Sequence, residues 1–295
     1  MAHRFVIADV FTERGFAGNQ LAVLPRADGL SERAMQRIAR EFNFAETTFV
    51  LPPRDPRHAR RVRIFTPRAE LPFAGHPTIG TAAVLARLGV IDTKAGKASI
   101  VLELGVGPVP VEIELGAEAV RAEFTIDKPV EVGQERPALA QCAEALSLPP
   151  AALVDAFYAS GGLRFCFVQL KNKAAVDQAT LDRGAWSRHF TQAWSNNFYL
   201  FAGDEKPYVR MFAPALGIDE DPATGSGAVA LAGVLAARHP ASDGTFTWPI
   251  DQGVAMGRPS RIEASAEKRG GKVTRIRIGG AAVLVAQGEI EEPAG

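Results

Sequence analysis

The sequence of 295 residues is poor in the features that mark several broad classes of protein. Its only cysteines, Cys142 and Cys166, are too few for a disulfide framework, and we expect both to be small buried side chains. No stretch contains the roughly 18 uninterrupted apolar positions that a transmembrane helix needs. The N-terminal segment MAHRFVIADVF has neither the apolar core nor the cleavage site of a signal peptide. These absences predict a cytoplasmic protein that binds no membrane.

An excess of charge of either sign is also missing. The 33 basic residues are balanced by 33 acidic ones, which argues against nucleic acid as a partner and favours a small neutral or zwitterionic ligand. The stretch GVGPVP (105–110) lacks the third glycine of a dinucleotide loop, and the sequence has no P-loop. The five histidines lack metal-ligand spacing; they are His3, His58, His76, His189 and His239. We therefore expect neither a metal nor an organic cofactor.

Strand patterns dominate the chain, because β-branched and alternating apolar runs recur along it. In the first half they cover 3–11, 46–51, 60–66, 98–104, 109–115 and 120–126. In the second half they cover 164–170, 197–203, 208–213, 245–250, 260–265, 272–278 and 281–287. Helices are expected over 31–43, with Ser31 as N-cap, and near 138–146 and 182–194. The tail from 289 to 295 is expected to fray.

Two further helices, over 77–89 and 226–238, are apolar on nearly every side and must be buried all round. In a protein rich in strands, a curled sheet around each helix meets this requirement. The sequence thus predicts an α+β fold of two pseudo-symmetric domains, each a mostly antiparallel barrel-like sheet around a central helix. The domains are expected at 1–127 and 128–295, joined by a linker rich in proline and charge. The last strand, about 281–288, can return to the first domain, and the active cleft is expected between the halves.

Both central helices are preceded by turns that carry polar residues. Gly75 and His76 open the first helix, with Pro77 in its first turn, and Thr224-Gly225-Ser226-Gly227 opens the second, with Ser226 as its N-cap and Asp221 just upstream. Unpaired amides and a partial positive charge make a helix N-terminus a carboxylate site. The alternative is a pair of ordinary capped core helices.

A candidate proton carrier lies at the start of an expected strand. In NFAETTFVL (43–51), Glu46 is surrounded in the sequence by Phe44, Ala45 and Phe49. Burial of a carboxylate raises its pKa, so Glu46 could exchange protons near neutral pH. A glutamate bonded to backbone amides at a strand end remains an alternative. Asn19, in a segment that resembles the two helix openings, is either a polar group of the cleft or part of an Asx-turn.

Four blocks of the sequence resemble the phenazine-biosynthesis isomerase family, the PhzF-like proteins with a diaminopimelate-epimerase-like fold. The blocks are MQRIAREFNFAETTFVL, RVRIFTPRAELPFAGHPTIGTA, RMFAPALGIDEDPATGSGA and QGVAMGRPS, in order within residues 4–265. The resemblance implies two similar barrel-like halves with the site between them, and a homodimer.

The resemblance also implies roles for individual residues. Glu46 matches the catalytic acid/base, Gly75 and His76 match the substrate-binding turn, and Asn19 matches the family's Gly-Asn pair. Asp221, Gly225 and Ser226 match the turn that holds the substrate carboxylate, and His76 and Asp221 are expected to hold its other polar groups.

Together with the candidate proton carrier and the two helix openings, the resemblance implies a cofactor-free isomerase that shifts a proton within a small cyclic carboxylic acid. The best substrate is trans-2,3-dihydro-3-hydroxyanthranilate, although Ala45 stands where a serine is expected in the phenazine enzymes proper. Alternatives are a racemase or epimerase of another amino or hydroxy acid, and a non-catalytic binder of carboxylate metabolites. A racemase with two thiols is disfavoured, because Cys142 and Cys166 lie outside every motif.

Overall fold

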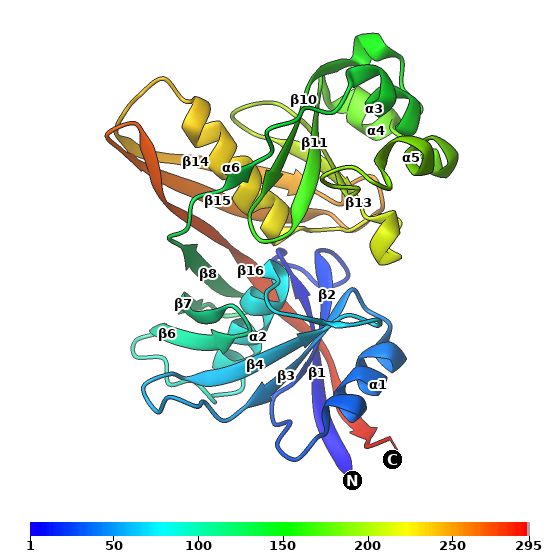
Figure 1. Ribbon diagram of the computed structural model, residues 1–295. Helices are drawn as coiled ribbons and strands as arrows, with labels where there is room; N and C mark the ends of the chain where they lie inside the picture. The colour runs from blue at the N-terminus through cyan, green and yellow to red at the C-terminus, as the bar shows by residue number, and fades with distance from the viewer. Residues whose placement is uncertain (294–295) are drawn as a thin grey trace. The chain divides into compact units, whose positions relative to one another are not determined.

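The computed structural model describes residues 1–293 and divides the chain into two compact units (Figure 1). Unit 1 contains Met1–Ile126 and the chain from Gly279 onward, and unit 2 contains Asp127–Ile278. The division falls one residue before the boundary expected at 127/128. The chain after Ile278 belongs to unit 1, as the expected return of the last strand requires.

Unit 1 contains all six strands expected for the first half, together with β2 and β5, which were not expected. Its strands are β1 (Ala2–Val10), β2 (Asn19–Leu24), β3 (Glu46–Leu51), β4 (Arg60–Phe65), β5 (Glu70–Leu71), β6 (Lys97–Leu104), β7 (Gly107–Leu115) and β8 (Val120–Ile126). Its helices are α1 (Glu32–Phe42) and α2 (Gly75–Arg87). The C-terminal part of β16 (Lys272–Glu291) completes the unit.

The sheet of unit 1 closes into a barrel. The strand order is β1-β2-β3-β4-β6-β7-β8-β16, and β16 also pairs antiparallel with β1. The α1 helix covers the outer face, with Met35 and Ile38 in a buried cluster that includes Phe49 and Phe65. Ser31 caps α1 as expected, because its hydroxyl accepts a hydrogen bond from the Ala34 amide at 3.1 Å.

Unit 2 contains the remaining elements. Its strands are β9 (Glu131–Val132), β10 (Leu153–Ser160), β11 (Arg164–Leu170), β12 (Phe198–Ala202), β13 (Tyr208–Phe212), β14 (Gly244–Gln252), β15 (Ser260–Arg269) and the first part of β16. Its α-helices are α3 (Leu139–Ala145), α4 (Lys173–Gln178), α5 (Arg183–Phe190) and α6 (Gly225–Arg238). The 3₁₀ turns η1 (Pro150–Ala152) and η2 (Pro214–Leu216) connect them.

The two units repeat one pattern of strand pairing, which confirms the expected pseudo-symmetry. In unit 1, β1–β2 is antiparallel, β2–β3 parallel, β3–β4 antiparallel and β4–β6 parallel. In unit 2, the pairs β10–β11, β11–β12, β12–β13 and β13–β14 follow the same sequence of directions. A parallel pair needs a crossover connection, and α2 and α6 occupy equivalent crossovers.

The two crossover helices are the apolar helices expected from the sequence. Every residue of α2 from Gly75 to Ala86 is buried, and the helix contacts β1, β2, β3, β7 and β8 of unit 1. Most of α6 is buried, and this helix contacts β10, β14 and β15 of unit 2. Figure 1 shows α2 inside the strands of unit 1. A helix in such a place needs no polar face, which explains the uniform apolar composition.

Several boundaries differ from the expected ones. The strands expected over 272–278 and 281–287 form one strand, β16, although Gly279 and Gly280 interrupt the β-branched pattern. A Cβ atom at Gly279 would lie 3.1–3.2 Å from atoms of Glu123 and Ala122, so the glycine permits a close strand approach. The tail from 289 to 295 was expected to fray, yet Glu289 and Ile290 pair with β1, and residues 294–295 lie outside the described part.

Other differences concern unit 2. The helix expected over 182–194 ends at Phe190, where Thr191 bonds back to the Ser187 carbonyl at 2.7 Å. Strand β10 and helix α4 were not expected, because Asp155 interrupts the alternation of β10 and α4 is only six residues long.

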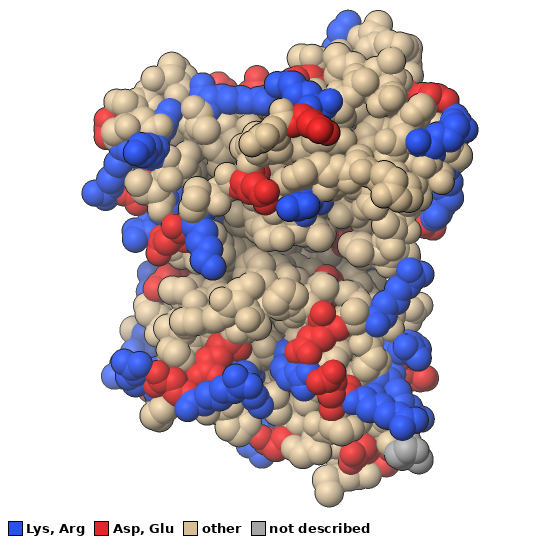
Figure 2. Space-filling view, in the orientation of Figure 1, with Lys and Arg blue, Asp and Glu red and all other residues tan. Residues whose placement is uncertain are grey.

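The surface carries charges of both signs. Figure 2 shows basic and acidic side chains interspersed on the visible face of each unit, in agreement with the balanced composition. Among the helices of residues 1–293, none is long and apolar enough to cross a membrane.

Candidate active site

Three of the residues singled out in the first half lie together in unit 1. The His76 Nδ1 atom lies 3.3 Å from Asn19 Nδ2 and 3.5 Å from Glu46 Oε2. His76 and Asn19 are buried, and the Glu46 side chain is 14% exposed. The structure thus joins a nearly buried carboxylate, an imidazole and an amide from three separate motifs.

The crossover topology brings these residues to one end of the barrel. Asn19 is the first residue of β2 and Glu46 is the first residue of β3, and these two strands are parallel and adjacent. His76 is the second residue of α2, whose N-terminus opens at the same end. Asn19 therefore lies at the start of a strand. Residues 13–24 contain no helix, although their sequence resembles the starts of the two central helices.

His76 is neutral at physiological pH. Burial lowers its pKa to about 3, and the Gln20 backbone only partly opposes this shift. The contact of 3.5 Å between Nδ1 and Glu46 therefore joins a neutral ring to a carboxyl group and is no full salt bridge. A neutral imidazole can donate one hydrogen bond and accept another.

The surroundings of Glu46 differ in one respect from the expectation. Phe49 was expected beside Glu46, but side chains alternate along β3, and Phe49 packs on the outer face against Phe65. Thr48 shares the inner face with Glu46, and it accepts a hydrogen bond of 2.9 Å from Thr81 of α2. Glu46 thus faces the central helix.

The N-terminus of α2 has no side-chain cap. The helix begins at Gly75, two residues before the expected start, so that Pro77 is its third residue. The N-cap residue is Ala74, which has no polar side chain. By contrast, Ser31, Asn172 and Asp182 cap α1, α4 and α5. The first amides of α2 are therefore available to an anion.

The residues singled out in the second half lie together in unit 2. Asp221 and Gly225 are buried at the start of α6, and Ser226 is partly exposed. The Thr224 hydroxyl donates a hydrogen bond of 2.5 Å to Asp221 Oδ2. The Asp221 carboxylate is therefore held against the turn that precedes the helix.

The expectation that Ser226 caps α6 is wrong. The helix begins at Gly225, so Ser226 is its second residue and the N-cap position belongs to Thr224. The Thr224 side chain makes no capping bond; its hydroxyl donates to Asp221 and accepts from the Gln252 side chain. Both central helices thus present first-turn amides that no side chain of the cap residue occupies.

Two further residues near Asp221 were not singled out from the sequence. Gln252, at the end of β14, is fully buried and bonds to Asp221 and Thr224. Tyr199 is fully buried, and its hydroxyl has no hydrogen-bond partner among residues 1–293. Burial and the charge of Asp221 raise the Tyr199 pKa, so the phenol stays protonated. The feature of the sequence that could have indicated Gln252 is the Gln-Gly pair that begins the block QGVAMGRPS.

The two cysteines lie elsewhere in unit 2. Cys142 and Cys166 are free, fully buried members of one core cluster, as expected from the sequence. Burial, reinforced by contact with Cys142, raises the pKa of the Cys166 thiol. Protonated thiols in an apolar core are poor proton carriers.

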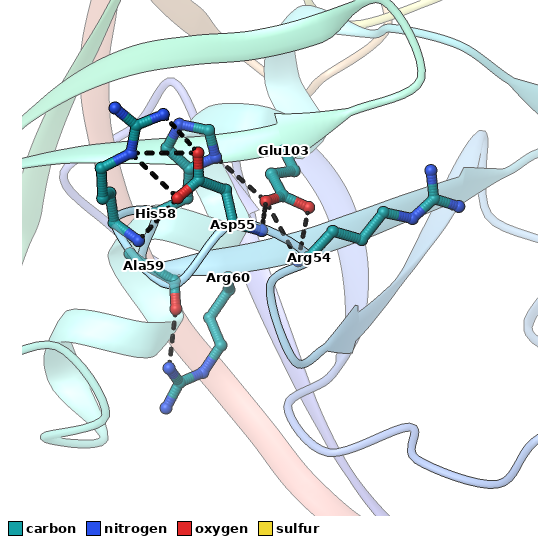
Figure 3. Close-up of polar contacts among 7 residues, drawn as sticks. Arg54, Asp55, His58, Ala59, Arg60 and Glu103 are labelled. Atoms are coloured by element: carbon teal, nitrogen blue, oxygen red, sulfur yellow. Dashed lines mark hydrogen bonds and ion pairs between the residues drawn. The ribbon is translucent and has the colours of Figure 1, made fainter.

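A separate polar cluster on unit 1 anchors a loop (Figure 3). The Glu103 carboxylate accepts hydrogen bonds from the Arg54 and Asp55 amides at 2.8–3.0 Å and contacts His58 Nδ1 at 3.0 Å. These bonds, led by that of the Arg54 amide, lower the pKa of Glu103 to about 2. Because the carboxylate is already satisfied by its own loop, we assign the cluster a structural role.

Comparison with known proteins agrees with the geometry. Residues 8–288 match the family described as phenazine biosynthesis-like protein. An uncharacterized isomerase of Mesorhizobium japonicum is 40% identical over 97% of this chain and 98% of its own. The trans-2,3-dihydro-3-hydroxyanthranilate isomerase of Pseudomonas aeruginosa is 38% identical, with the same two coverages.

A solved structure shares the fold. The Bacillus anthracis phenazine biosynthesis protein of the PhzF family superposes with a TM-score of 0.87 over 99% of both chains, at 24% identity. The paired barrels are thus the α+β arrangement of the diaminopimelate-epimerase type. From the match over most of its length and from these relatives, the chain belongs to the PhzF-like phenazine biosynthesis family and is an isomerase.

Proposed function

We propose that this isomerase shifts a proton within a small cyclic carboxylic acid, with Glu46 as the acid/base group and without a cofactor. The observation that carries the proposal is the group of Glu46, His76 and Asn19 at the uncapped N-terminus of α2. A nearly buried carboxyl group beside a neutral imidazole suits proton transfer to and from carbon.

The substrate that best fits is trans-2,3-dihydro-3-hydroxyanthranilate, converted to its keto tautomer. Support comes from the 38% identical relative that carries this activity in its name. The first turns of α2 in unit 1 and of α6 in unit 2 have no side-chain cap, so the amides of Gly75 in the one and of Gly225 and Ser226 in the other are each suited to a carboxylate. His76, Asn19 and Asp221 would hold the hydroxyl and amino groups.

In this mechanism Glu46 removes a proton from the ring carbon that bears the hydroxyl and delivers a proton to a distant ring carbon. The neutral His76 ring, with the pKa far below 7, can donate a hydrogen bond without adding a competing acid. Two buried thiols in the core of unit 2 do not suit the two-thiol chemistry of related racemases.

The substitution Glu46→Gln tests the proposal, because it keeps shape and hydrogen bonding but removes the base. We expect turnover of the cyclic acid to fall by about 10⁴-fold, the upper end for general acid–base catalysis. Affinity for 3-hydroxyanthranilate, measured by calorimetry, should change much less, since the carboxylate is held by helix amides. Glu41→Gln, on the exposed surface of α1, is the matched control.

Each alternative gives a distinct result in the same assays. A Glu46→Gln protein within tenfold of the wild type would refute the assigned role. Inversion of a stereocentre seen by polarimetry would indicate a racemase or epimerase, and tight binding without turnover would indicate a binder. Activity lost on chelation and restored by a metal would contradict the cofactor-free mechanism. In heavy water, deuterium at the new C–H position would show exchange of the Glu46 proton with solvent.

A further inference from the structure

The amide of Gln252 makes three hydrogen bonds at the start of α6, and all lie within unit 2. Its Nε2 donates to the Asp221 carbonyl at 2.8 Å and to the Thr224 hydroxyl at 2.9 Å. Its Oε1 accepts the Thr224 amide at 3.1 Å. The same Thr224 hydroxyl donates a hydrogen bond of 2.5 Å to the Asp221 carboxylate, which links Gln252 indirectly to that carboxylate.

The partners fix the orientation of the Gln252 amide. Nε2 faces a carbonyl oxygen and Oε1 faces an N–H group, so the flipped amide would oppose like groups. Nε2 therefore donates to the Thr224 hydroxyl oxygen. The single proton of that hydroxyl must then point toward Asp221 Oδ2. Gln252 thus holds the Thr224 hydroxyl in the orientation that donates its proton to the Asp221 carboxylate.

The same arrangement keeps the α6 N-terminus uncapped. A threonine at the N-cap position ordinarily accepts a hydrogen bond from a first-turn amide. Here the Thr224 hydroxyl is engaged with Gln252 and Asp221 and makes no capping bond. The first-turn amides of α6 therefore stay open to a ligand.

Gly253 explains how Gln252 reaches this position. Gly253 has a φ of +73°, and a Cβ atom there would lie 2.4 Å from the Arg258 carbonyl oxygen and 2.6 Å from that of Pro222. Only glycine tolerates both the left-handed backbone and the close approach. The end of β14 is thereby pressed against the turn that contains Asp221.

We propose that Gln252 is a positioning residue for the reaction: through the Thr224 hydroxyl it orients the Asp221 carboxylate and keeps the α6 amides open for the substrate carboxylate. This inference rests on the proposed function, since it presumes that Asp221 and the α6 amides contact substrate. Gln252 itself is fully buried behind Thr224 and needs no contact with substrate.

Two variants of Thr224 test the hydrogen bond between its hydroxyl and the Asp221 carboxylate. Thr224→Val removes the hydroxyl but keeps the shape and cannot cap α6, so we expect kcat to fall by about 10²-fold, the loss typical of a misplaced catalytic group. KM should stay within about threefold, because the α6 amides remain open. Thr224→Ser restores the hydroxyl and should restore kcat to within about threefold of the wild type. Equal activity of the Val and Ser variants would overturn the proposal.

Gln252→Met tests the hydrogen bond between the Gln252 amide and the Thr224 hydroxyl, because methionine is similar in size but has no amide. We expect a comparable loss in kcat, and in the Thr224→Val background we expect the same substitution to cost clearly less than it does alone, because the part of its effect that passes through the hydroxyl is already lost. Independent losses that multiply in the double variant would overturn the proposal, as a merely structural role would produce them.

A crystal structure of the Thr224→Val protein separates this inference from the proposed function. Rotation of the Asp221 carboxylate away from its wild-type position supports positioning even if no cyclic acid is turned over, in which case only the proposed substrate fails. An unmoved Asp221 carboxylate in that variant would overturn the positioning role whatever the activity.

Discussion

At the scale of the residue, burial sets the protonation state of His76. His76 is 4% exposed, and desolvation lowers its pKa to about 3. The lowered pKa of His76 makes the stability of the folded protein depend on pH. Below pH 6.5, the ordinary pKa of histidine, the imidazole of His76 becomes protonated in the unfolded chain but stays neutral in the folded protein. The contribution of His76 to stability is therefore complete above pH 6.5 and declines as the pH falls toward 3.

We predict that the His76 ring does not titrate from about pH 5 to about pH 8, the range in which a free histidine changes charge. Long-range ¹H–¹⁵N NMR of the imidazole should show one neutral tautomer across this range. Free imidazole in the same sample serves as the internal control. A His76 titration midpoint near the ordinary value would contradict the burial argument and the neutral donor in the proposed mechanism.

At the scale of the element, the two central helices depend on small residues where neighbouring side chains press against them. Gly227, in the first turn of α6, lies against the Tyr199 ring. A Cβ atom there would be 2.3 Å from Cε2 and 2.5 Å from Cδ2. Because the ring is rigid and fully buried, the helix start or the ring would have to move.

We predict that Gly227→Ala destabilises the protein by about 1–3 kcal/mol, the usual cost of overpacking a core. Urea unfolding gives the free energy, and the ligand affinity should fall too, because the first turn of α6 shifts. Gly184→Ala, at an exposed position of α5, is the control: its Cβ would lie 3.1 Å from Asp182 Oδ1, a small contact that the higher helix propensity of alanine offsets, so we expect a change of less than about 1 kcal/mol. Equal stability of the two variants would show that the Tyr199 ring yields freely.

At the scale of the whole molecule, the first barrel is closed by the last strand of the chain. Residues Ala282–Glu291 pair with Ala2–Val10, so unit 1 combines both ends of the sequence. We predict that a chain ending at Ile278 leaves β1 as an unpaired edge. Hydrogen–deuterium exchange of the β1 amides that bond to β16 should then approach the unprotected rate, because local opening costs little free energy at a frayed edge, whereas the amides of Val6–Val10 that bond to β2 should stay protected.

A chain ending at Glu292 is the control for this truncation, since it keeps every pair between β1 and β16. Its β1 amides should exchange as slowly as those of the full-length protein. Full protection of residues 2–10 in the shorter chain would mean that the barrel is stable without its closing strand.

The sequence alone determined the fold class and the two buried helices, and it indicated Glu46, His76, Asn19 and Asp221 but neither Gln252 nor Tyr199. Uniformly apolar helices among many strands require barrels around them, and that argument uses only local composition. The positions of Glu46, His76 and Asp221 followed from motifs, because proton transfer and helix-terminal binding need particular residue types at particular turns.

Tertiary structure decided the partners of those residues. Phe49 turned to the opposite face of β3 from Glu46, because strand alternation and the packing of α1 outweigh proximity in sequence. The Thr224 hydroxyl bonds to Asp221 instead of capping α6, because Gln252, 28 residues away, supplies the competing donor. Such choices depend on contacts between distant segments, which local composition cannot specify, whereas burial of an apolar helix depends on the helix itself.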